Sequence, residues 1–298
     1  MEEKQSKSEE INISEIFSII FSNKKLIITI TGLSILISFL IAFSLNETYK
    51  SSALLKASES IQSNGMGPLS NQYNGLASIA GINLPSGDAE TKKNLVLATI
   101  TSRDFFKHLV DKYNYYPQII AAKAINESNK KIIYDTSIYK DEKWIREEGD
   151  PTYLEAHSLF IKNNLELGYD KQRDHLTISI KHISPLFAKS MLDNLILEVN
   201  NVIREKDLID SSNSLEYLKN ALNETQVKDI KVSINSLIEK KLEAKMLASI
   251  KEDYVLMIID SPYIPLKPFA PNKLLILIFG FLGGILAGIS IALIRSWS

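Results

Sequence analysis

The sequence predicts an α+β protein in which two transmembrane helices flank one domain with a long protruding helix. Two uncharged, mostly apolar runs of 20 residues carry this prediction, Leu26 to Leu45 and Leu274 to Leu293, and strand-like and helical patterns alternate between them. At about 1.5 Å rise per residue, such a helix spans roughly 30 Å, the thickness of a bilayer's hydrocarbon core. We therefore predict transmembrane helices at residues 26–45 and 273–294 and a soluble domain at residues 46–272.

Other interpretations of the two runs fit less well. The apolar region of a signal peptide is usually about 7 to 15 residues long, which is shorter than either run. A helix of this length in a soluble core normally carries charge on one face, and neither run contains a charged residue. We therefore expect both runs to lie in the lipid bilayer.

Lysines indicate the orientation. Four precede the first run, at Lys4, Lys7, Lys24 and Lys25. The residues around the second run, Lys267, Lys273 and Arg295, argue weakly for the opposite orientation. Because the first helix usually dominates, we expect cytoplasmic segments at residues 1–25 and 295–298 and a periplasmic domain between the helices.

Composition excludes several classes of function. A net charge of -1 gives no reason to expect a nucleic-acid partner. With no cysteine, the chain has no disulfide, thiol nucleophile or cysteine-based zinc site. We expect no cofactor and no metal.

The N-terminal part of the chain changes character several times. Ile13, Ile16, Phe17 and Ile20 recur at helical spacing, which predicts either an amphipathic helix at the membrane surface or an extension of the first span. Residues 49–58 follow as a strand. The stretch from 61 to 87 holds five glycines and two prolines, which predicts loops, and it lacks the lysine or hydroxyl spacing of a phosphate-binding loop.

The middle of the chain mixes helices and strands. Residues 90–114 have helical periodicity with a break at Thr101 and Ser102, and 115–150 form a connector of unassigned structure. Pro151 suits the first turn of a helix, and two strands follow at 165–169 and 175–183. The expected core residues of that helix are Tyr153, Leu154, Leu159, Phe160 and Ile161.

The longest helical pattern begins at Pro185. No glycine and no further proline occurs up to Thr225, and a second helical stretch, about 226–250, follows with barely a turn signal. The two stretches together give a helical region at about 185–250, continuous, kinked or folded back as a hairpin. Helices this long usually pack lengthwise against partners, which favours self-association. The predicted apolar stripe of the first stretch comprises Ala188, Met191, Leu192, Leu195, Val199, Val202 and Ile209.

A buried strand is predicted at 254–259, followed by a proline-rich segment at 262–271. Its prolines, at steps of three, are Pro262, Pro265, Pro268 and Pro271. Polyproline II has three residues per turn, so the four prolines would line one edge of a stiff segment that leads into the second span. An ordinary proline-rich linker is the equally open alternative.

Small residues in the two spans predict close helix packing. Gly280, Gly284 and Gly288 are four apart in the second span, and Ser34, Ser38 and Ala42 are four apart in the first. Stripes of small residues let helices approach closely in lipid. We expect these six residues to mediate packing within the chain or between subunits.

No enzymatic motif appears. The histidines, His108, His157, His175 and His182, do not form an H-E-x-x-H pattern with neighbours such as Glu155, Asp170 and Asp174. No G-x-S-x-G nucleophile motif occurs either. Paired carboxylates brought together by the fold stay open in principle. We expect a protein that is not an enzyme.

The chain resembles the Wzz-type chain-length determinants, which are class 1 polysaccharide co-polymerases of the bacterial inner membrane. The resemblance runs over nearly the whole chain: residues 13–25, 75–82, 176–185 with Ala188, Asn200, 254–260, the spaced prolines and the glycine-containing last helix. It implies an α+β base, a long helix projecting into the periplasm, and a ring-like homo-oligomer. It also implies a non-enzymatic regulator of the modal chain length of an O-antigen-like lipopolysaccharide, acting with a Wzy-type polymerase. Direct contact with the polysaccharide is left open by the resemblance.

The same patterns are compatible with two alternative functions, a capsule or other exopolysaccharide co-polymerase and a two-span periplasmic sensor or adaptor. Only residues 294–298 follow the second run, and they contain no Walker loop. We therefore expect neither a kinase domain on this chain nor the cytoplasmic signalling module of a sensor.

Overall fold

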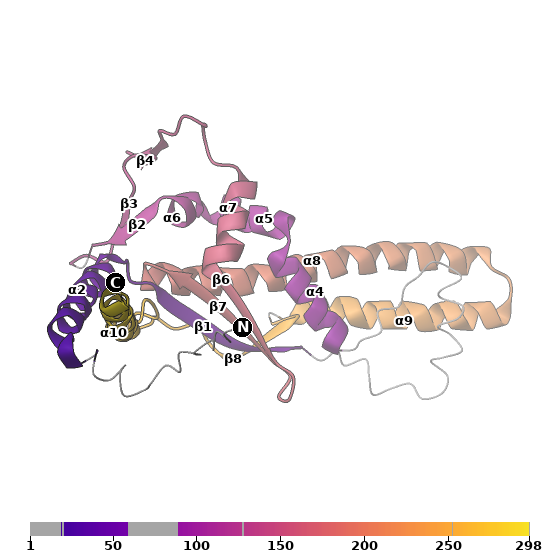
Figure 1. Ribbon diagram of the computed structural model, residues 1–298. Coiled ribbons are helices and arrows are strands. Elements are labelled where there is room, and N and C mark those ends of the chain that lie inside the picture. Colours follow the sequence, from indigo (N-terminus) through magenta and orange to yellow (C-terminus); the bar gives the residue numbers. More distant parts are fainter. Residues whose placement is uncertain (1–18, 20, 59–88, 127, 252, 298) are drawn as a thin grey trace, which may run out of the picture. The chain divides into compact units, whose positions relative to one another are not determined.

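The computed structural model describes residues 19, 21–58, 89–126, 128–251 and 253–297 (Figure 1). The chain forms two compact units, one of residues 1–48 with 268–298 and one of residues 49–267. The amphipathic pattern at Ile13 to Ile20 rests on residues outside the described part of the chain, and so does the predicted loop at 61–87.

The first unit contains two long apolar helices, α2 (Lys24–Ser44) and α10 (Lys273–Trp297). Both are long and apolar enough to cross a membrane, and only 11% of the apolar window of each is buried. A core helix of a soluble protein would bury its apolar side chains, whereas these helices leave most of theirs exposed. The two helices therefore flank, along the chain, a unit of mixed helix and sheet, which confirms the predicted fold class.

The second unit combines helices with an antiparallel sheet. Its helices are α4 (Ala89–Thr101), α5 (Arg103–Tyr113), α6 (Tyr116–Ile120), α7 (Tyr153–Leu159), α8 (Pro185–Glu224) and α9 (Lys228–Ile250), with a π-helical turn η2 (Phe160–Asn164) after α7. Its strands are β1 (Tyr49–Ala57), β2 (Ala122–Ile125), β3 (Ile132–Tyr134), β4 (Tyr139–Lys140), β5 (Lys143–Trp144), β6 (Leu165–Asp170), β7 (His175–His182) and β8 (Leu256–Asp260).

The main sheet has the strand order β6-β7-β1-β8, and every neighbouring pair is antiparallel. The central pair, β1 and β7, runs in register from Tyr49 opposite His182 to Leu55 opposite Leu176. The strands predicted at 49–58, 165–169 and 175–183 are confirmed. The unassigned connector at 115–150 holds α6 and two small separate hairpins, β2–β3 and β4–β5.

The core lies between the sheet and the helices that cover one of its faces. Alternate residues of the central strands are fully buried, including Leu55, Ile178 and Ile180, because successive side chains of a strand point to opposite faces. Phe106 of α5 and Leu192 of α8 belong to the same cluster. The predicted break after α4 is real, since the Ser102 hydroxyl accepts a hydrogen bond from the Phe105 backbone N–H at 3.2 Å and caps α5.

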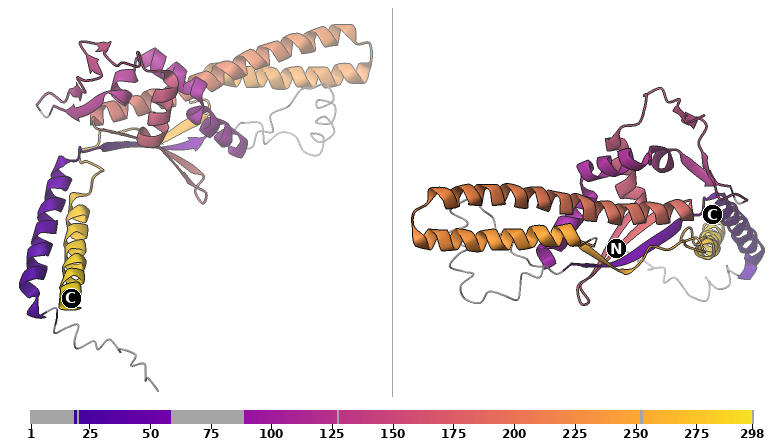
Figure 2. Two further views of the ribbon diagram at one scale, coloured as in Figure 1. Left: turned by 45° about the horizontal axis from the view of Figure 1, so that its top comes forward. Right: turned by 180° about the vertical axis from the view of Figure 1, so that it is seen from behind.

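Helix α8 is a single helix of 40 residues, and α9 folds back alongside it (Figures 1 and 2). Of the three arrangements that the sequence left open, the hairpin is therefore the correct one. The α8 segment up to Ile203 packs into the core, whereas the later part packs on α9. The predicted apolar stripe was wrong at its end, because Ile209 is 54% exposed beyond the core.

Two other predictions were wrong. The strand predicted as buried at 254–259 is buried only at its start, where Val255 and Leu256 belong to the core. The rest lies in β8, an edge strand paired only with β1, and its Met257, Ile258 and Ile259 are exposed. The helix after Pro151 begins at Tyr153, since Thr152 caps it. Ala156 and Phe160 are the buried residues of this region, so Leu154 and Ile161 face outward.

Candidate functional site

The six small residues predicted to pack belong to α2 and α10, which run antiparallel to each other. A Cβ added at Gly280 would lie 2.5 Å from the Cβ of Ser38, and one at Gly284 would lie 2.8 Å from the Cβ of Ser34. Real Cβ atoms do not approach other atoms this closely, so only glycine permits this helix spacing at these two positions.

One side-chain hydrogen bond joins the two helices among the described residues. The Ser34 hydroxyl donates to the backbone carbonyl of Gly280 at 2.7 Å. A polar bond of this kind helps to hold helices together in lipid, where apolar side chains gain little by leaving the hydrocarbon. The Thr31 hydroxyl, also in this contact, is buried without a partner.

The contact face on α2 differs in part from the predicted stripe. Gly288 packs on Ile27, with an added Cβ 3.1 Å from the Ile27 Cα, and Gly284 also approaches Thr31. Ala42 is fully buried but is not among the atoms nearest the three glycines. Sequence reasoning missed Ile27 and Thr31, although Thr31 precedes Ser34 by three residues and so shares its helix face.

The other end of the helix pair carries an ion pair. The Lys273 ammonium lies 2.7 Å from a carboxylate oxygen of Glu47 and 4.9 Å from the centroid of the Phe43 ring. Beside it, the Thr48 backbone N–H donates to the Ala270 carbonyl at 2.8 Å, forming an isolated antiparallel bridge. These contacts join the chain segment after α2 to the segment before α10.

The predicted proline segment has no regular secondary structure apart from that bridge at Ala270. Pro262 and Pro265 are buried, Pro268 is exposed and Pro271 is partly buried. The role of the segment as a stiff connection stays a prediction.

A buried carboxylate joins α5 to α8 in the second unit. Only 1% of the Glu198 side chain is exposed, and three groups of α5 donate to it or pair with it. The Lys112 ammonium and Tyr113 hydroxyl lie 2.9 Å from one carboxylate oxygen, and His108 Nε2 lies 2.8 Å from the other. Burial raises the pKa of Glu198, but the hydrogen bonds from Lys112, His108 and Tyr113 together hold the pKa below its ordinary value.

The same cluster keeps Tyr113 protonated. Burial, and then its bond to the Glu198 carboxylate, raise the pKa of Tyr113 to about 12. Its hydroxyl therefore donates at neutral pH. The cluster was invisible in the sequence, because its partners are 85 to 90 residues apart.

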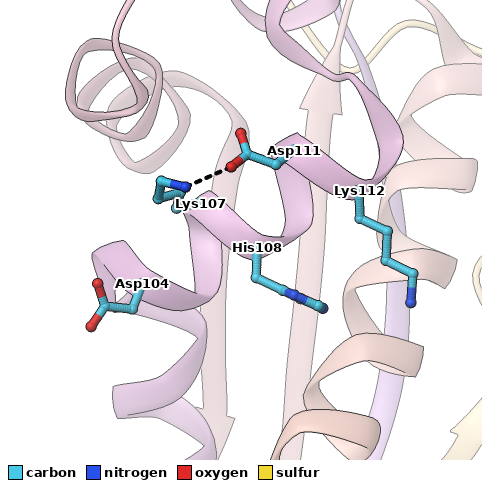
Figure 3. Close-up of a pocket in the computed structure, with 5 residues that line it drawn as sticks. All are labelled: Asp104, Lys107, His108, Asp111 and Lys112. Atoms are coloured by element: carbon cyan, nitrogen blue, oxygen red, sulfur yellow. Dashed lines mark hydrogen bonds and ion pairs between the residues drawn. The ribbon is translucent and has the colours of Figure 1, made fainter.

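A shallow pocket lies along the outer side of α5 (Figure 3). Its lining residues are Asp104, Lys107, His108, Asp111 and Lys112. Within it, Lys107 pairs with Asp111 at 2.8 Å, and His108 and Lys112 are engaged by Glu198. The carboxylates and cations thus pair largely with one another, and no nucleophile stands beside a base in this pocket.

His157, Glu155, Asp170 and Asp174, also named as candidates, have structural partners. His157 Nε2 lies 3.0 Å from the Thr101 carbonyl, and Glu155 pairs with Arg146 at 2.9 Å. Asp174 accepts from the Tyr169 hydroxyl at 2.7 Å, and Asp170 accepts from backbone N–H groups of its own turn. Among the described residues, no group of three or more histidine, aspartate or glutamate side chains is placed to hold a metal ion.

His182 is buried and neutral. Its Nε2 lies 2.9 Å from the Gln118 carbonyl, and its Nδ1 accepts from the Ser184 backbone N–H at 3.0 Å. This pattern requires the proton to be on Nε2. Burial lowers the pKa of His182 to about 4, so the ring stays uncharged at neutral pH.

Residues 9–113 match the Wzz family model, described as chain length determinant protein. The match covers α2, β1, α4 and α5, and it confirms the resemblance to the Wzz-type chain-length determinants. A comparison with curated proteins finds no match.

Three solved structures are similar to the chain. A full-length bacterial polysaccharide co-polymerase is 13% identical, with 96% of this chain and 97% of that chain covered and a TM-score of 0.41. A fragment of WzzB, a polysaccharide co-polymerase from Salmonella Typhimurium, is 13% identical over 76% of this chain and 100% of that chain, with a TM-score of 0.32. A mutant of the Shigella flexneri lipopolysaccharide O-antigen chain-length regulator WzzB is 12% identical over 74% and 100%, with a TM-score of 0.24.

Proposed function

We propose that the protein regulates the chain length of a bacterial surface polysaccharide. The observation that carries this proposal is the match of residues 9–113 to the chain length determinant family. The layout agrees with it, because two helices able to cross a membrane flank a unit of mixed helix and sheet. The polymer that we propose is an O-antigen-like lipopolysaccharide.

The proposed mode of action is not enzymatic. His108, His157 and His182 contact structural groups, and Glu155 pairs with Arg146, which supports a structural role for these side chains. We propose that the chain forms a homo-oligomer in the inner membrane and acts beside a Wzy-type polymerase, which makes the glycosidic bonds.

The paired membrane helices and the α8–α9 hairpin support the assembly part of this proposal. The outer faces of α2 and α10 expose large apolar side chains, which suits lipid or a neighbouring subunit. Chemical cross-linking in native membranes should give products larger than a monomer. Monomer alone at every cross-linker concentration would contradict the oligomer.

Deletion of the gene tests the function itself. Surface polysaccharides from the deletion strain are separated on a gel beside those of the parent, with lipopolysaccharide and capsule analysed separately. We expect the modal length of the lipopolysaccharide chains to be lost or shifted, and a plasmid copy of the wild-type gene to restore it. An unchanged length distribution, while the parent expresses the protein, would refute the proposal.

A further inference from the structure

Three aromatic side chains meet at the two small hairpins of the second unit. Tyr139 and Trp144 are cross-strand partners in β4–β5, with ring centroids 4.7 Å apart. Tyr134, at the end of β3, lies edge-on to Tyr139 with centroids 5.3 Å apart. We call Tyr134, Tyr139 and Trp144 the aromatic cluster.

The aromatic cluster lies outside the hydrophobic core. No residue of β2, β3, β4 or β5 is buried, and the three rings are all partly exposed. Figure 1 shows β4 on a segment that rises away from the main sheet and returns to α7. Core packing therefore does not explain why three large aromatic residues gather there.

The polar groups of the aromatic cluster have no partner among the described residues. No hydrogen bond joins the Tyr134 hydroxyl, the Tyr139 hydroxyl or the Trp144 indole N–H to any of them. Two partly buried tyrosines elsewhere in the unit are bonded internally: Tyr116 donates to Asp111 and Tyr254 donates to Asp207, each at 2.7 Å. The cluster thus offers ring surface and hydrogen-bonding groups together to an external molecule.

The turn between β4 and β5 fixes the cluster's geometry. Asp141 and Glu142 both have positive φ, at 49° and 61°, as in the type I′ turns that join two-stranded hairpins. Such a turn sets the register that places Tyr139 opposite Trp144. Because its geometry is fixed before binding, the aromatic cluster loses less conformational entropy when a ligand binds.

We propose that the aromatic cluster binds sugar rings of the polysaccharide whose length the protein regulates. A pyranose has an apolar face of C–H groups and a rim of hydroxyls. Tyrosine and tryptophan match this pattern, because each combines an apolar ring with a polar edge. Lys140 and Lys143, exposed and paired across the same hairpin, add donors for sugar hydroxyls. The identity of the ligand rests on the proposed function.

Binding is measured directly on the full-length protein in detergent micelles. The chain has two tryptophans, Trp144 and Trp297, so a Trp297→Phe variant leaves Trp144 as the sole indole fluorophore. The probe is polysaccharide released by mild acid from the surface of the same cells. We expect a saturable change in Trp144 emission during the titration. Emission that stays constant over the whole range, with no heat of binding by calorimetry, would overturn the proposal.

Variants then locate the binding site. Calorimetry should show about tenfold or weaker binding of the same probe to Trp144→Ala and to Tyr139→Ala. Tyr217→Ala is the matched control, since Tyr217 of α8 is exposed but lies outside the cluster. Trp144→Phe keeps a ring and removes the N–H, so it keeps the proposal testable if the alanine variants do not fold. We expect weaker binding by Trp144→Phe at an unchanged melting temperature.

The two proposals fail in different ways. Wild-type affinity in folded cluster variants would overturn the sugar-binding site, even if gene deletion alters chain length. An unchanged length distribution after gene deletion would refute the function, whatever the purified protein binds. Wild-type chain lengths in a strain that carries Trp144→Ala, with binding lost in the titration, would also count against a role of the cluster in polysaccharide recognition.

Discussion

Glu198 places a carboxylate inside the second unit, where an unpaired charge would cost several kcal/mol. That cost is offset by hydrogen bonds and ion pairs with three residues of one helix, α5, namely Lys112, His108 and Tyr113. The α5 partners also remain partly open to solvent, with His108 45% and Lys112 48% exposed. The cluster therefore fixes α5 on α8 and leaves the cationic groups hydrated.

Replacing Glu198 should destabilise the second unit. Glu198→Ala removes three interactions and leaves a cavity beside α8, so we expect the free energy of unfolding to fall by about 2–4 kcal/mol. Thermal unfolding of the solubilised protein measures the change. Lys107→Ala is the control, because the Lys107–Asp111 ion pair on the same helix is exposed and its loss should leave the melting temperature nearly unchanged. Equal effects of the two substitutions would contradict the assigned role.

His182 should make stability depend on pH. Its pKa is about 4 in the folded protein and about 6.5 in the unfolded chain, so the unfolded chain binds more protons between these values. Stability contributed by the neutral ring is full above about pH 6.5 and is lost as pH falls to about 4. The loss amounts to roughly 3–4 kcal/mol, at about 1.4 kcal/mol for each pKa unit.

The measurement is the melting temperature in micelles at pH 7.5, 6.0 and 5.0. His182→Asn cannot take up the proton, so its melting temperature should fall less than that of the wild type over this range, from a lower value at pH 7.5. The Glu198 carboxylate loses its contribution only below its ordinary pKa of 4.5, outside that range. Parallel pH curves for His182→Asn and the wild type would show that His182 is not the titrating group.

At the scale of elements, the sequence predicted correctly those helix and strand features that depend on interactions between neighbouring residues. The strand predicted at 175–183 is β7, and the break predicted at Thr101 and Ser102 separates α4 from α5. Strand alternation and helix capping both act between near neighbours in the chain. The fold-back of α9 on α8 could not be predicted, because packing between distant residues selects it. The exposure of Met257 in β8 also depends on position at the sheet edge, which no local pattern encodes.

The candidate sites also contain some residues that the sequence reveals and others that only the folded structure brings together. Gly280 and Ser34 belong to small-residue stripes that are visible in the sequence, whereas the contact of Gly288 with Ile27 depends on how the helices cross. No local pattern in the sequence distinguishes the role of Trp144 from that of other aromatic residues. Only the folded structure shows that Tyr113 is bonded to Glu198, whereas Trp144 packs on Tyr139.

Bulk at Gly284 should separate α2 from α10. Gly284→Leu would place side-chain atoms within the space of Ser34 and Thr31, so the helices must move apart. Gly283→Leu is the matched control on the next residue, because a Cβ at Gly283 meets nothing within 4 Å. The chain has no cysteine, so a pair introduced by Thr48→Cys and Ala270→Cys, which are bridge partners, reports on pairing without background.

We expect the disulfide between positions 48 and 270 to form several-fold more slowly when Gly284→Leu is present and at the original rate with Gly283→Leu. Equal rates in the two backgrounds would show that close packing at Gly284 does not govern the pairing of the helices.

At the scale of the whole molecule, the helix pair has two electrically different ends. Because α2 and α10 are antiparallel, Lys24 and Lys25 lie at the same end as Arg295, and all three are exposed. The opposite end carries Lys273, which is paired with Glu47. The unbalanced basic end matches the positive-inside rule for a cytoplasmic face.

We therefore expect the basic end of the helix pair, with both chain termini, to be cytoplasmic and the second unit to be periplasmic. Single cysteines at three exposed serines test this: Ser22→Cys and Ser296→Cys at the basic end, and Ser261→Cys after β8. With the outer membrane permeabilised, a membrane-impermeant maleimide should label Ser261→Cys alone, and the other two only after the inner membrane is opened. The reverse pattern would contradict the orientation. In an antiparallel pair, positions 22 and 296 face the same compartment. Different labelling of Ser22→Cys and Ser296→Cys would therefore contradict the antiparallel arrangement itself.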